Sequence, residues 1–411
     1  MTQARLALPG AADADRRLAA FATTVGAKPL VFAALSVLVI AAVTRFTRLA
    51  EAQAVGQPTV PVDFTVFWTA ARMFLSGDTP ALLAATELAG FEGGQDQWMP
   101  WLYPPGYLML IFPLGMLPFG VAWVGFSALS LVALALALRP FAAVSVPVWL
   151  AATISAGALP ALTLGQNSLL WLAALVGAMA LLRADRPVLA GGLIGLMTLK
   201  PQLGPLLAVA MLAGGHWRVV ASAALTAVLL AVLPTLVLGT AYWSDLAAML
   251  SRHGARVYAL ADTAPHMASL FALLLWLGLA KPLALALQWA VFALLIGAVA
   301  VTWRKPVALD LKIAVLLAAL PLSSPYLWQY EAAALPLAAL FLLRAGVLRP
   351  TLAHGVLILL LWAAAWPADV VQSLWPNAFL AAHHLVAPLG LIALTLTLRA
   401  VFSPVSPAPN A

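Results

Sequence analysis

Apolar runs follow one another from Leu30 to Leu398, and this pattern most constrains what the chain can fold into. Hydrophobic residues make up 64% of the 411 residues and charged residues only 9%, whereas soluble domains carry roughly 25% charged residues. A chain with so few charges cannot cover a surface that faces water, so most of it must face lipid. We therefore predict an all-α polytopic membrane protein.

We expect about twelve transmembrane helices of about 20 residues each. Residues 106–138 are too long for one span, and Pro113 and Pro118 are candidate break points. Residues 188–199 and 203–214 are short, and they fit two half-helices, one kinked helix or two tilted spans. The remaining predicted spans are residues 30–46, 141–160, 168–182, 219–238, 283–302, 307–322, 331–343, 351–366 and 378–398.

The first apolar run has two interpretations. Ala50-Glu51-Ala52 fits the small-x-small pattern of a signal-peptide cleavage site. Nearly thirty residues precede the run, however, and basic residues flank it, which favours an uncleaved first span. Both interpretations place the segment after Thr44 outside the cell.

Basic clusters fall at alternate ends of the predicted spans, as the positive-inside rule requires of cytoplasmic ends. We therefore expect residues 1–29 to be a cytoplasmic segment, residues 30–400 a single transmembrane domain, and residues 401–411 a disordered cytoplasmic tail. The charge pattern indicates membrane orientation and gives no reason to expect a nucleic-acid partner. The basic clusters are Arg139, Arg183 with Arg186, His216 to Arg218, Arg304-Lys305, Arg344 with Arg349, and Arg399.

With this orientation, almost every unusual polar motif lies on the extracytoplasmic face. Two long outer loops are predicted, at residues 45–105 and 239–282. The first holds a predicted amphipathic helix at 64–75, and the second a predicted interfacial or re-entrant helix at 267–279. The sequence therefore predicts one polar, active outer face.

Asp63 stands directly before the predicted helix of the first outer loop. A carboxylate at the boundary between water and lipid can take a proton from a hydroxyl that attacks a lipid-linked substrate. An aspartate in this place is also a favoured helix cap. Asp63 is our candidate catalytic base, and it can serve in both roles.

Lys200 interrupts the apolar stretch between residues 188 and 214, where a charge costs about 2.5–3.5 kcal/mol on insertion scales. It must reach water, pair with an acid or bind an anion, for which a phosphate is the natural choice. Glu331 opens a later span, where it either stabilises the helix dipole or faces the polar cavity, with Lys200 as its possible partner. Arg252 and Arg256 in the second loop are further candidates for binding a phosphate.

Several polar and aromatic residues are candidates for contacting a sugar or an acceptor. Gln166 and Asn167 form a polar turn that either binds hydroxyls or caps the next helix. Tyr103 belongs to a Trp-Leu-Tyr-Pro-Pro-Gly-Tyr motif that equally suits an aromatic belt at the membrane entry. His266 and Trp328 complete the set.

We expect no metal site. His383 and His384 are adjacent, so their side chains point about 100° apart on a helix and cannot both face one ion comfortably.

Taken in order, these motifs resemble glycosyltransferase family 87, whose mycobacterial members are polyprenol-phosphate-mannose-dependent α-mannosyltransferases. The resemblance covers about residues 60 to 345. It is carried by Asp63 to Arg72, Tyr103-Pro104-Pro105, Gly165-Gln166-Asn167, Leu189-Ala190-Gly191 through Lys200-Pro201-Gln202, and Ser324-Pro325-Tyr326-Leu327.

The resemblance implies a C-type glycosyltransferase (GT-C) fold, a polyprenyl-phosphate sugar donor, a lipid or glycan acceptor and an aspartate base at the position of Asp63. The resemblance implies no cofactor and no metal. It also implies enzymatic activity at the outer face of a bacterial inner membrane. One departure is that mycobacterial members have a histidine near Trp328 to Glu331, where this chain has Gln329-Tyr330-Glu331. The acceptor type is therefore open.

The resulting expectation is an inverting transfer of a hexose, with mannose first, in which Asp63 is the base and Lys200 stabilises the leaving phosphate. Two other classes stay open. A transporter or flippase would also use broken helices and a lysine within the membrane, although it would need polar residues along a path to both faces. A polymerase or ligase of lipid-linked glycans would share the same outer face.

Overall fold

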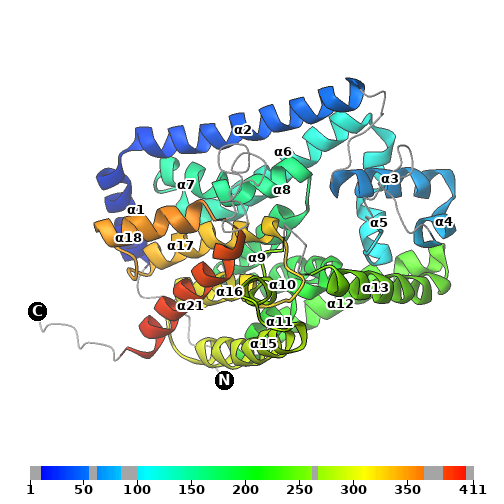
Figure 1. Cartoon of the computed structure of the whole chain (residues 1–411). Coiled ribbons are helices and arrows are strands. Elements are labelled where there is room, and N and C mark those ends of the chain that lie inside the picture. Colours follow the sequence, from blue (N-terminus) through cyan, green and yellow to red (C-terminus); the bar gives the residue numbers. More distant parts are fainter. Residues whose placement is uncertain (1–10, 55–62, 85–99, 262–266, 365–382, 404–411) are drawn as a thin grey trace, which may run out of the picture.

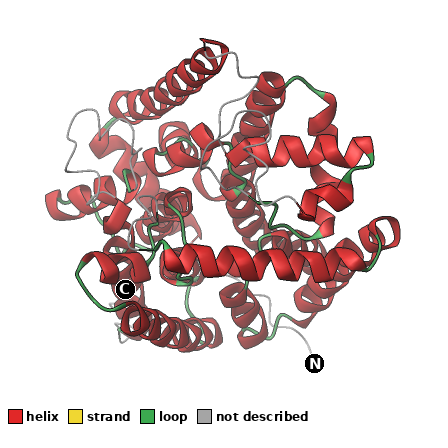
Figure 2. Ribbon diagram, turned by 45° about the vertical axis from the view of Figure 1, so that its right-hand side comes forward, coloured by secondary structure: helices red, strands yellow, loops and turns green. Residues whose placement is uncertain are grey.

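The computed structural model describes residues 11–54, 63–84, 100–261, 267–364 and 383–403. Within these ranges the regular elements are helices (Figures 1 and 2), apart from one isolated antiparallel bridge between Met267 and Trp328. The prediction of an all-α chain is therefore confirmed for the described residues.

Five helical stretches of the described chain are long and apolar enough to cross a membrane. The other apolar helices are shorter, so the structure supports a multi-pass membrane protein, and the expected count of about twelve spans stays a prediction. The five are α2 (Ala27–Ala54), α6 (Phe119–Ala142), the run Val146–Leu164 with α7 (Val146–Thr153), η2 (Ala156–Ala158) and α8 (Leu159–Leu164), α12 (Trp217–Leu238) and α15 (Lys281–Arg304).

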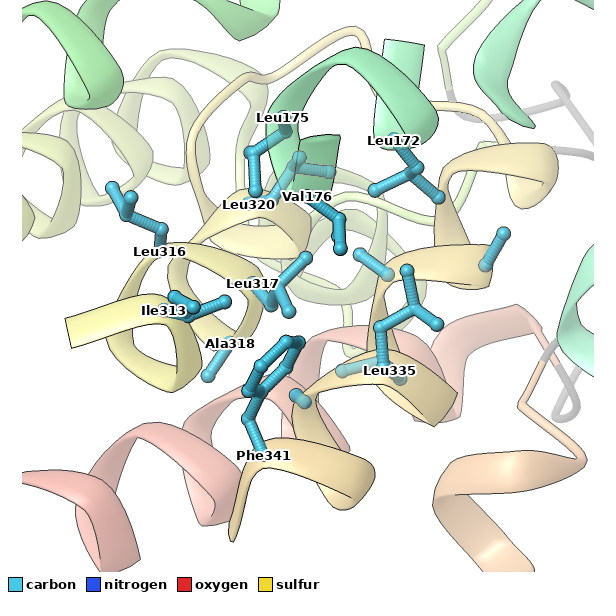
Figure 3. Close-up of a cluster of buried hydrophobic side chains, with 14 of the residues drawn as sticks. Leu172, Leu175, Val176, Ile313, Leu316, Leu317, Ala318, Leu320, Leu335 and Phe341 are labelled. Carbon is cyan, nitrogen blue, oxygen red and sulfur yellow. The ribbon is translucent and has the colours of Figure 1, made fainter. Parts of the chain in front are cut away.

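The core is built around three shorter helices, α9 (Ser168–Arg183), α16 (Leu309–Ala319) and α17 (Ala334–Arg344). Figure 3 shows Val176 of α9, Leu317 of α16 and Phe341 of α17 packed against one another. Every residue of α17 is buried. In contrast, α2 and α12 expose large apolar side chains such as Phe32 and Leu236, which suits helices that face lipid.

Prolines break the helices where the sequence predicted. The stretch 106–138 divides at Pro118, between α5 (Pro105–Ile111) with η1 (Phe112–Met116) and the long α6. The second break lies at Lys200-Pro201. Because a proline disfavours the α conformation of the preceding residue, Lys200 adopts φ −129° and ψ 71° between two single turns. These turns are η3 (Met197–Leu199), which follows α10 (Pro187–Leu196), and η4 (Pro201–Leu203), which precedes α11 (Pro205–Ala213).

The helix that contains the first predicted span is longer than the apolar run. The apolar run ends near residue 46, but α2 continues to Ala54. Arg45 does not end the helix, because its guanidinium lies 4.1 Å from the centre of the Trp123 ring and donates to Ser127 Oγ and to the carbonyl of Leu162. Because these partners satisfy its guanidinium, Arg45 can lie within a helix among apolar neighbours.

The loops and tails hold more helix than was expected. The second loop that was predicted to be extracytoplasmic, at 239–282, contains α13 (Ala241–Ala259), which is amphipathic and therefore gives no apolar run. Its α14 (Leu270–Trp276) is shorter than the helix predicted at 267–279. The helix expected at 64–75 is present as α3 (Asp63–Ser76), followed by α4 (Thr79–Ala84). The N-terminal segment forms α1 (Ala11–Val25). The last two predicted spans, 351–366 and 378–398, overlap with α18 (Leu352–Trp362) and α21 (Val386–Phe402), and residues 365–382 lie outside the described part of the chain. Residues 404–411 lie outside the described part of the chain.

A buried arginine holds α1 against the C-terminal end of α17. The Arg344 guanidinium donates to Asp310 Oδ1 at 2.8 Å, to Asp15 Oδ1 at 3.0 Å and to the carbonyl of Phe141. Arg17 in turn donates to the Arg344 carbonyl at 3.0 Å. We call Arg344, Asp310, Asp15 and Arg17 the arginine cluster. In Figure 1, α1 lies at the left of the molecule and α3 and α4 at the right.

Candidate active site

Asp63 is the first residue of α3, a position that favours a negative charge because it faces the positive end of the helix dipole. One face of α3 is buried through Phe64 and Phe67, which pack at 5.5 and 5.9 Å from the ring centre of Phe126. The tyrosine ring of Tyr107 meets Phe67 edge-on at 5.3 Å. This aromatic packing fixes the start of α3, and with it the carboxylate of Asp63.

The polar turn between α8 and α9 lies against the start of α3. Gly165 has φ 74°, and a Cβ on it would lie 2.5 Å from the Cβ of Phe64 and 2.8 Å from Trp123 Nε1. Glycine is therefore required both for the conformation and for the close approach. The turn brings Gln166 to Asp63, where Gln166 Nε2 donates a hydrogen bond of 2.5 Å to Asp63 Oδ2.

Asn167 occupies the N-cap position of α9 without using its side chain as a cap. The alternative that this turn only caps the next helix is therefore wrong for the side chain of Asn167. Its Oδ1 is a buried acceptor that receives no hydrogen bond from the protein. Such an oxygen suits a hydroxyl donor of a bound ligand.

Lys200 and Glu331 form a buried ion pair, as the sequence suggested they could. Lys200 Nζ donates to Glu331 Oε1 and, at 3.1 Å, to Ser168 Oγ at the start of α9. Nζ also lies 4.9 Å from the centre of the Tyr330 ring. Glu331 reaches it from η6 (Gln329–Ala333), the single turn that precedes α17.

Gln166 and Ser168 join these two contacts into one site, because they are two residues apart and bind Asp63 and Lys200 respectively. We call Asp63, Gln166, Ser168, Lys200 and Glu331 the outer site. Asp63 and Lys200 therefore lie at the same end of the helices, which the predicted mechanism requires.

The pKa of Asp63 is raised to about 6, because burial disfavours the charged carboxylate. The hydrogen bond from Gln166 and the charge of Lys200 each act in the opposite direction and keep the pKa of Asp63 from rising further. A carboxyl group with a pKa of about 6 is charged at neutral pH and still basic enough to accept a proton in a reaction.

Tyr103 lies beside the outer site within an aromatic group. Its ring is 5.3 Å from Phe67 and 4.6 Å from Tyr107, and its carbonyl accepts a hydrogen bond from the Tyr242 hydroxyl. The same hydroxyl accepts a 2.6 Å hydrogen bond from Trp101 Nε1. Through Tyr242, the loop predicted at 239–282 thus packs on the loop predicted at 45–105.

The remaining candidates lie in the second loop and its neighbours. Trp328 pairs with Met267 through the isolated bridge, and it packs against a buried apolar cluster that includes Phe271. Arg252 and Arg256 are exposed on α13. His266, predicted to contact the sugar, lies outside the described residues.

Three residues in or next to the outer site were not among the sequence candidates. Ser168 and Tyr330 both contact the Lys200 ammonium, and Gln329 carries a buried Oε1 that accepts no hydrogen bond. Each is adjacent to, or two residues from, a residue that the sequence did indicate. The signal available was this proximity to a polar motif at the predicted outer face.

One of the comparisons with known proteins finds a family for the chain. The sequence model of glycosyltransferase family 87 matches residues 101–325, which is more than half of the chain. No curated protein and no solved structure matches the chain. The matched region contains Gln166, Ser168 and Lys200, while Asp63 and Glu331 flank it.

Proposed function

The chain belongs to glycosyltransferase family 87, and from this membership we propose that it transfers a hexose, with mannose as the first candidate, from a polyprenyl phosphate. The acceptor is a lipid or a glycan at the extracytoplasmic face of a bacterial inner membrane. The fold proposed for residues 30–400 is a single GT-C domain with about twelve spans and outer loops at 45–105 and 239–282. Residues 1–29 and 401–411 are then cytoplasmic.

The observation that carries the proposal is the joint placement of Asp63 and Lys200 in the outer site, through Gln166 and Ser168. A glycosyl transfer of this kind needs a base for the acceptor hydroxyl and a positive charge for the leaving phosphate. Both groups stand here at the ends of apolar helices, where a lipid-linked donor would present its head group.

The proposed reaction is a single displacement at the anomeric carbon. The acceptor oxygen forms a bond to this carbon as its proton passes to Asp63, and the bond from the carbon to the phosphate oxygen breaks. The electron pair leaves with the polyprenyl phosphate, which needs no proton. A β-linked donor would give an α-linked product by inversion.

Lys200 stabilises the negative charge that develops on the leaving phosphate. An ammonium group has three N–H donors, and Ser168 and Glu331 accept two of those of Lys200. One donor is left for a phosphate oxygen, while Glu331 holds the ammonium in place. Arg252 and Arg256 of α13 are proposed as additional phosphate contacts.

Of the sequence candidates for contacts with the sugar and the acceptor, Gln166 is set aside because its amide binds Asp63. The proposed contacts are Asn167, Tyr103, Trp328, His266 and Glu331. Support comes from the buried acceptor oxygens of Asn167 and Gln329, which lack a protein donor. A buried acceptor without a partner costs about 1–3 kcal/mol, and a sugar hydroxyl would remove that cost on binding.

The test is transfer by the purified full-length protein in detergent. Radiolabelled polyprenyl-phosphate mannose, glucose and arabinose are each offered with a lipid extract as acceptor, to wild type and to Asp63→Asn. We expect labelled product from one donor with wild type and almost none with the variant. Product from both proteins would refute Asp63 as the base. Absence of product with every donor, across acceptor extracts from several bacteria, would refute the donor class.

A further inference from the structure

We propose that Gln166 is a positioning residue that orients the carboxylate of Asp63, and not a contact for the sugar. The inference rests on the proposed function, in which Asp63 is the base. The position of Gln166 in a polar turn does not by itself indicate this role. The role follows from the hydrogen bonds that the two ends of the Gln166 side-chain amide make.

The Gln166 amide makes a hydrogen bond at each end. Nε2 donates to Asp63 Oδ2 at 2.5 Å, and Oε1 accepts from the backbone N–H of Asn167 at 3.3 Å. Turning the amide over would place Oε1 against the carboxylate oxygen and Nε2 against a backbone donor, so only the observed orientation is favourable. A buried amide that is held in this way has little capacity left for a sugar hydroxyl.

The backbone around Gln166 is fixed where it meets α3. The Cα of Gly165 lies so close to Phe64 that no Cβ can be accommodated, and Phe64 directly follows Asp63. The Trp123 ring, which also lies against Gly165, is covered by the Arg45 guanidinium at 4.1 Å. The same guanidinium donates to the carbonyl of Leu162 in α8, three residues before Gly165. The turn and the start of α3 are therefore held as one unit.

A fixed donor on Oδ2 has a definite chemical consequence. It leaves Oδ1 of Asp63 to accept the proton of the attacking hydroxyl, and it sets the direction in which that oxygen points. Positioning of this kind changes the rate of the chemical step and not the affinity for substrate. The hydrogen bond also favours the charged form of the carboxyl group.

Other charged or titratable groups surround Asp63 as well. The ammonium of Lys200, the carboxylate of Glu331 and the hydroxyls of Tyr103 and Tyr330 all interact electrostatically with the outer site. The ring of Tyr107, on α5, packs against Phe67, which lies about one helical turn after Asp63 on α3. A substitution of Gln166 that keeps its size leaves all these groups in place, so a change in the titration of Asp63 would report the lost hydrogen bond.

The test uses Gln166→Met, which has nearly the same length and no donor, in the full-length protein. The matched control is Gln53→Met, the same substitution at an exposed residue near the end of α2. Two quantities are measured for each protein. One is the titration of the Asp63 carboxyl group by infrared difference spectroscopy, with the band assigned by its loss in Asp63→Asn. The other is the pH profile of kcat and KM for glycosyl transfer.

We expect Gln166→Met to raise the pKa of Asp63 by about one unit, since a hydrogen bond to a charged group is worth at least one such unit. The acid limb of the kcat profile should move upward by the same amount, which by itself lowers kcat at pH 7 about twofold. The lost orientation of the carboxylate should bring the total loss to about tenfold. KM for donor and acceptor should stay near the wild-type values. Gln53→Met should match wild type in both measurements.

An unchanged titration of Asp63 in a folded Gln166→Met variant would overturn the inference. A raised KM with an unchanged kcat would also overturn it, because that result is expected for a residue that contacts the sugar. The infrared titration needs no turnover. If wild type transfers no sugar from any donor, the proposed function fails, while a shifted titration would still support the pairing of Gln166 with Asp63.

Discussion

The outer site and the arginine cluster both bury a cation with carboxylates, at opposite ends of the same helix. Glu331 precedes α17 and Arg344 ends it, across about 16 Å of helix at 1.5 Å per residue. Arg344 has two carboxylates and a backbone carbonyl as acceptors. Lys200 has one carboxylate and one hydroxyl, and the nearby Asp63 receives its hydrogen bond from a neutral amide.

Under the proposed function, this difference separates a region that serves stability from a region that serves chemistry. In the arginine cluster the guanidinium joins α1, α16 and α17. In the outer site, the pKa of Asp63 is raised by burial, and the acceptors of Asn167 and Gln329 are unsatisfied. Groups that are costly to keep in the folded protein are typical of sites that bind a substrate.

The largest effect on stability is expected for Arg344→Met. This change leaves Asp310 and Asp15 without their cation and should lower the free energy of unfolding by about 3–5 kcal/mol. Unfolding in detergent, followed by circular dichroism, measures it. Arg349→Met, at an exposed arginine five residues away, is the control and should be near neutral. Equal free energies of unfolding for the two variants would contradict a structural role of the arginine cluster.

A similar cost is expected when either member of the Lys200–Glu331 pair is changed alone. Lys200→Met and Glu331→Gln should each destabilise by about 3–5 kcal/mol, because each leaves one buried charge. The double variant should recover most of this loss, since no unpaired charge remains.

Transfer distinguishes the two roles of Lys200 in that double variant. If Lys200 stabilises the leaving phosphate, the double variant should transfer sugar about 10²-fold more slowly than wild type although it is stable. A double variant with the wild-type rate would show that the pair, like the arginine cluster, only holds helices together.

The sequence singled out four residues that the structure brings together, while it missed one of the helices. Asp63, Gln166, Lys200 and Glu331 stand out because polar residues are rare in an apolar chain, and the positive-inside rule placed them on one face. Helix α13 escaped prediction because its apolar residues are spread along one face and form no run. The contact of Gln166 with Asp63 could not be predicted either, because it depends on how closely Gly165 approaches Phe64, and the sequence does not contain that distance.

The smallest effect expected is on the pH dependence of transfer. The base must be charged, and the pKa of Asp63 is about 6, so the rate should fall about tenfold per pH unit below 6 and level off above it. The raised pKa also means that the charged form is less stable in the folded protein than in the unfolded chain. Burial of Asp63 therefore costs no stability below the ordinary pKa of an aspartate, where the carboxyl group is protonated in both states. The stability of the folded protein falls as the pH rises from there through about 6. An acid limb near pH 4 would contradict the buried setting of Asp63.

The most direct test of the account compares two substitutions of aspartate by asparagine, Asp63→Asn in the outer site and Asp310→Asn in the arginine cluster. Transfer rate per folded molecule and unfolding midpoint are measured on the same preparations. We predict that Asp63→Asn lowers the rate about 10²–10⁴-fold with no loss of stability, and that Asp310→Asn lowers the unfolding midpoint and keeps the rate. If Asp63→Asn instead unfolds the protein, or transfers sugar at the wild-type rate, the division between the two regions is wrong.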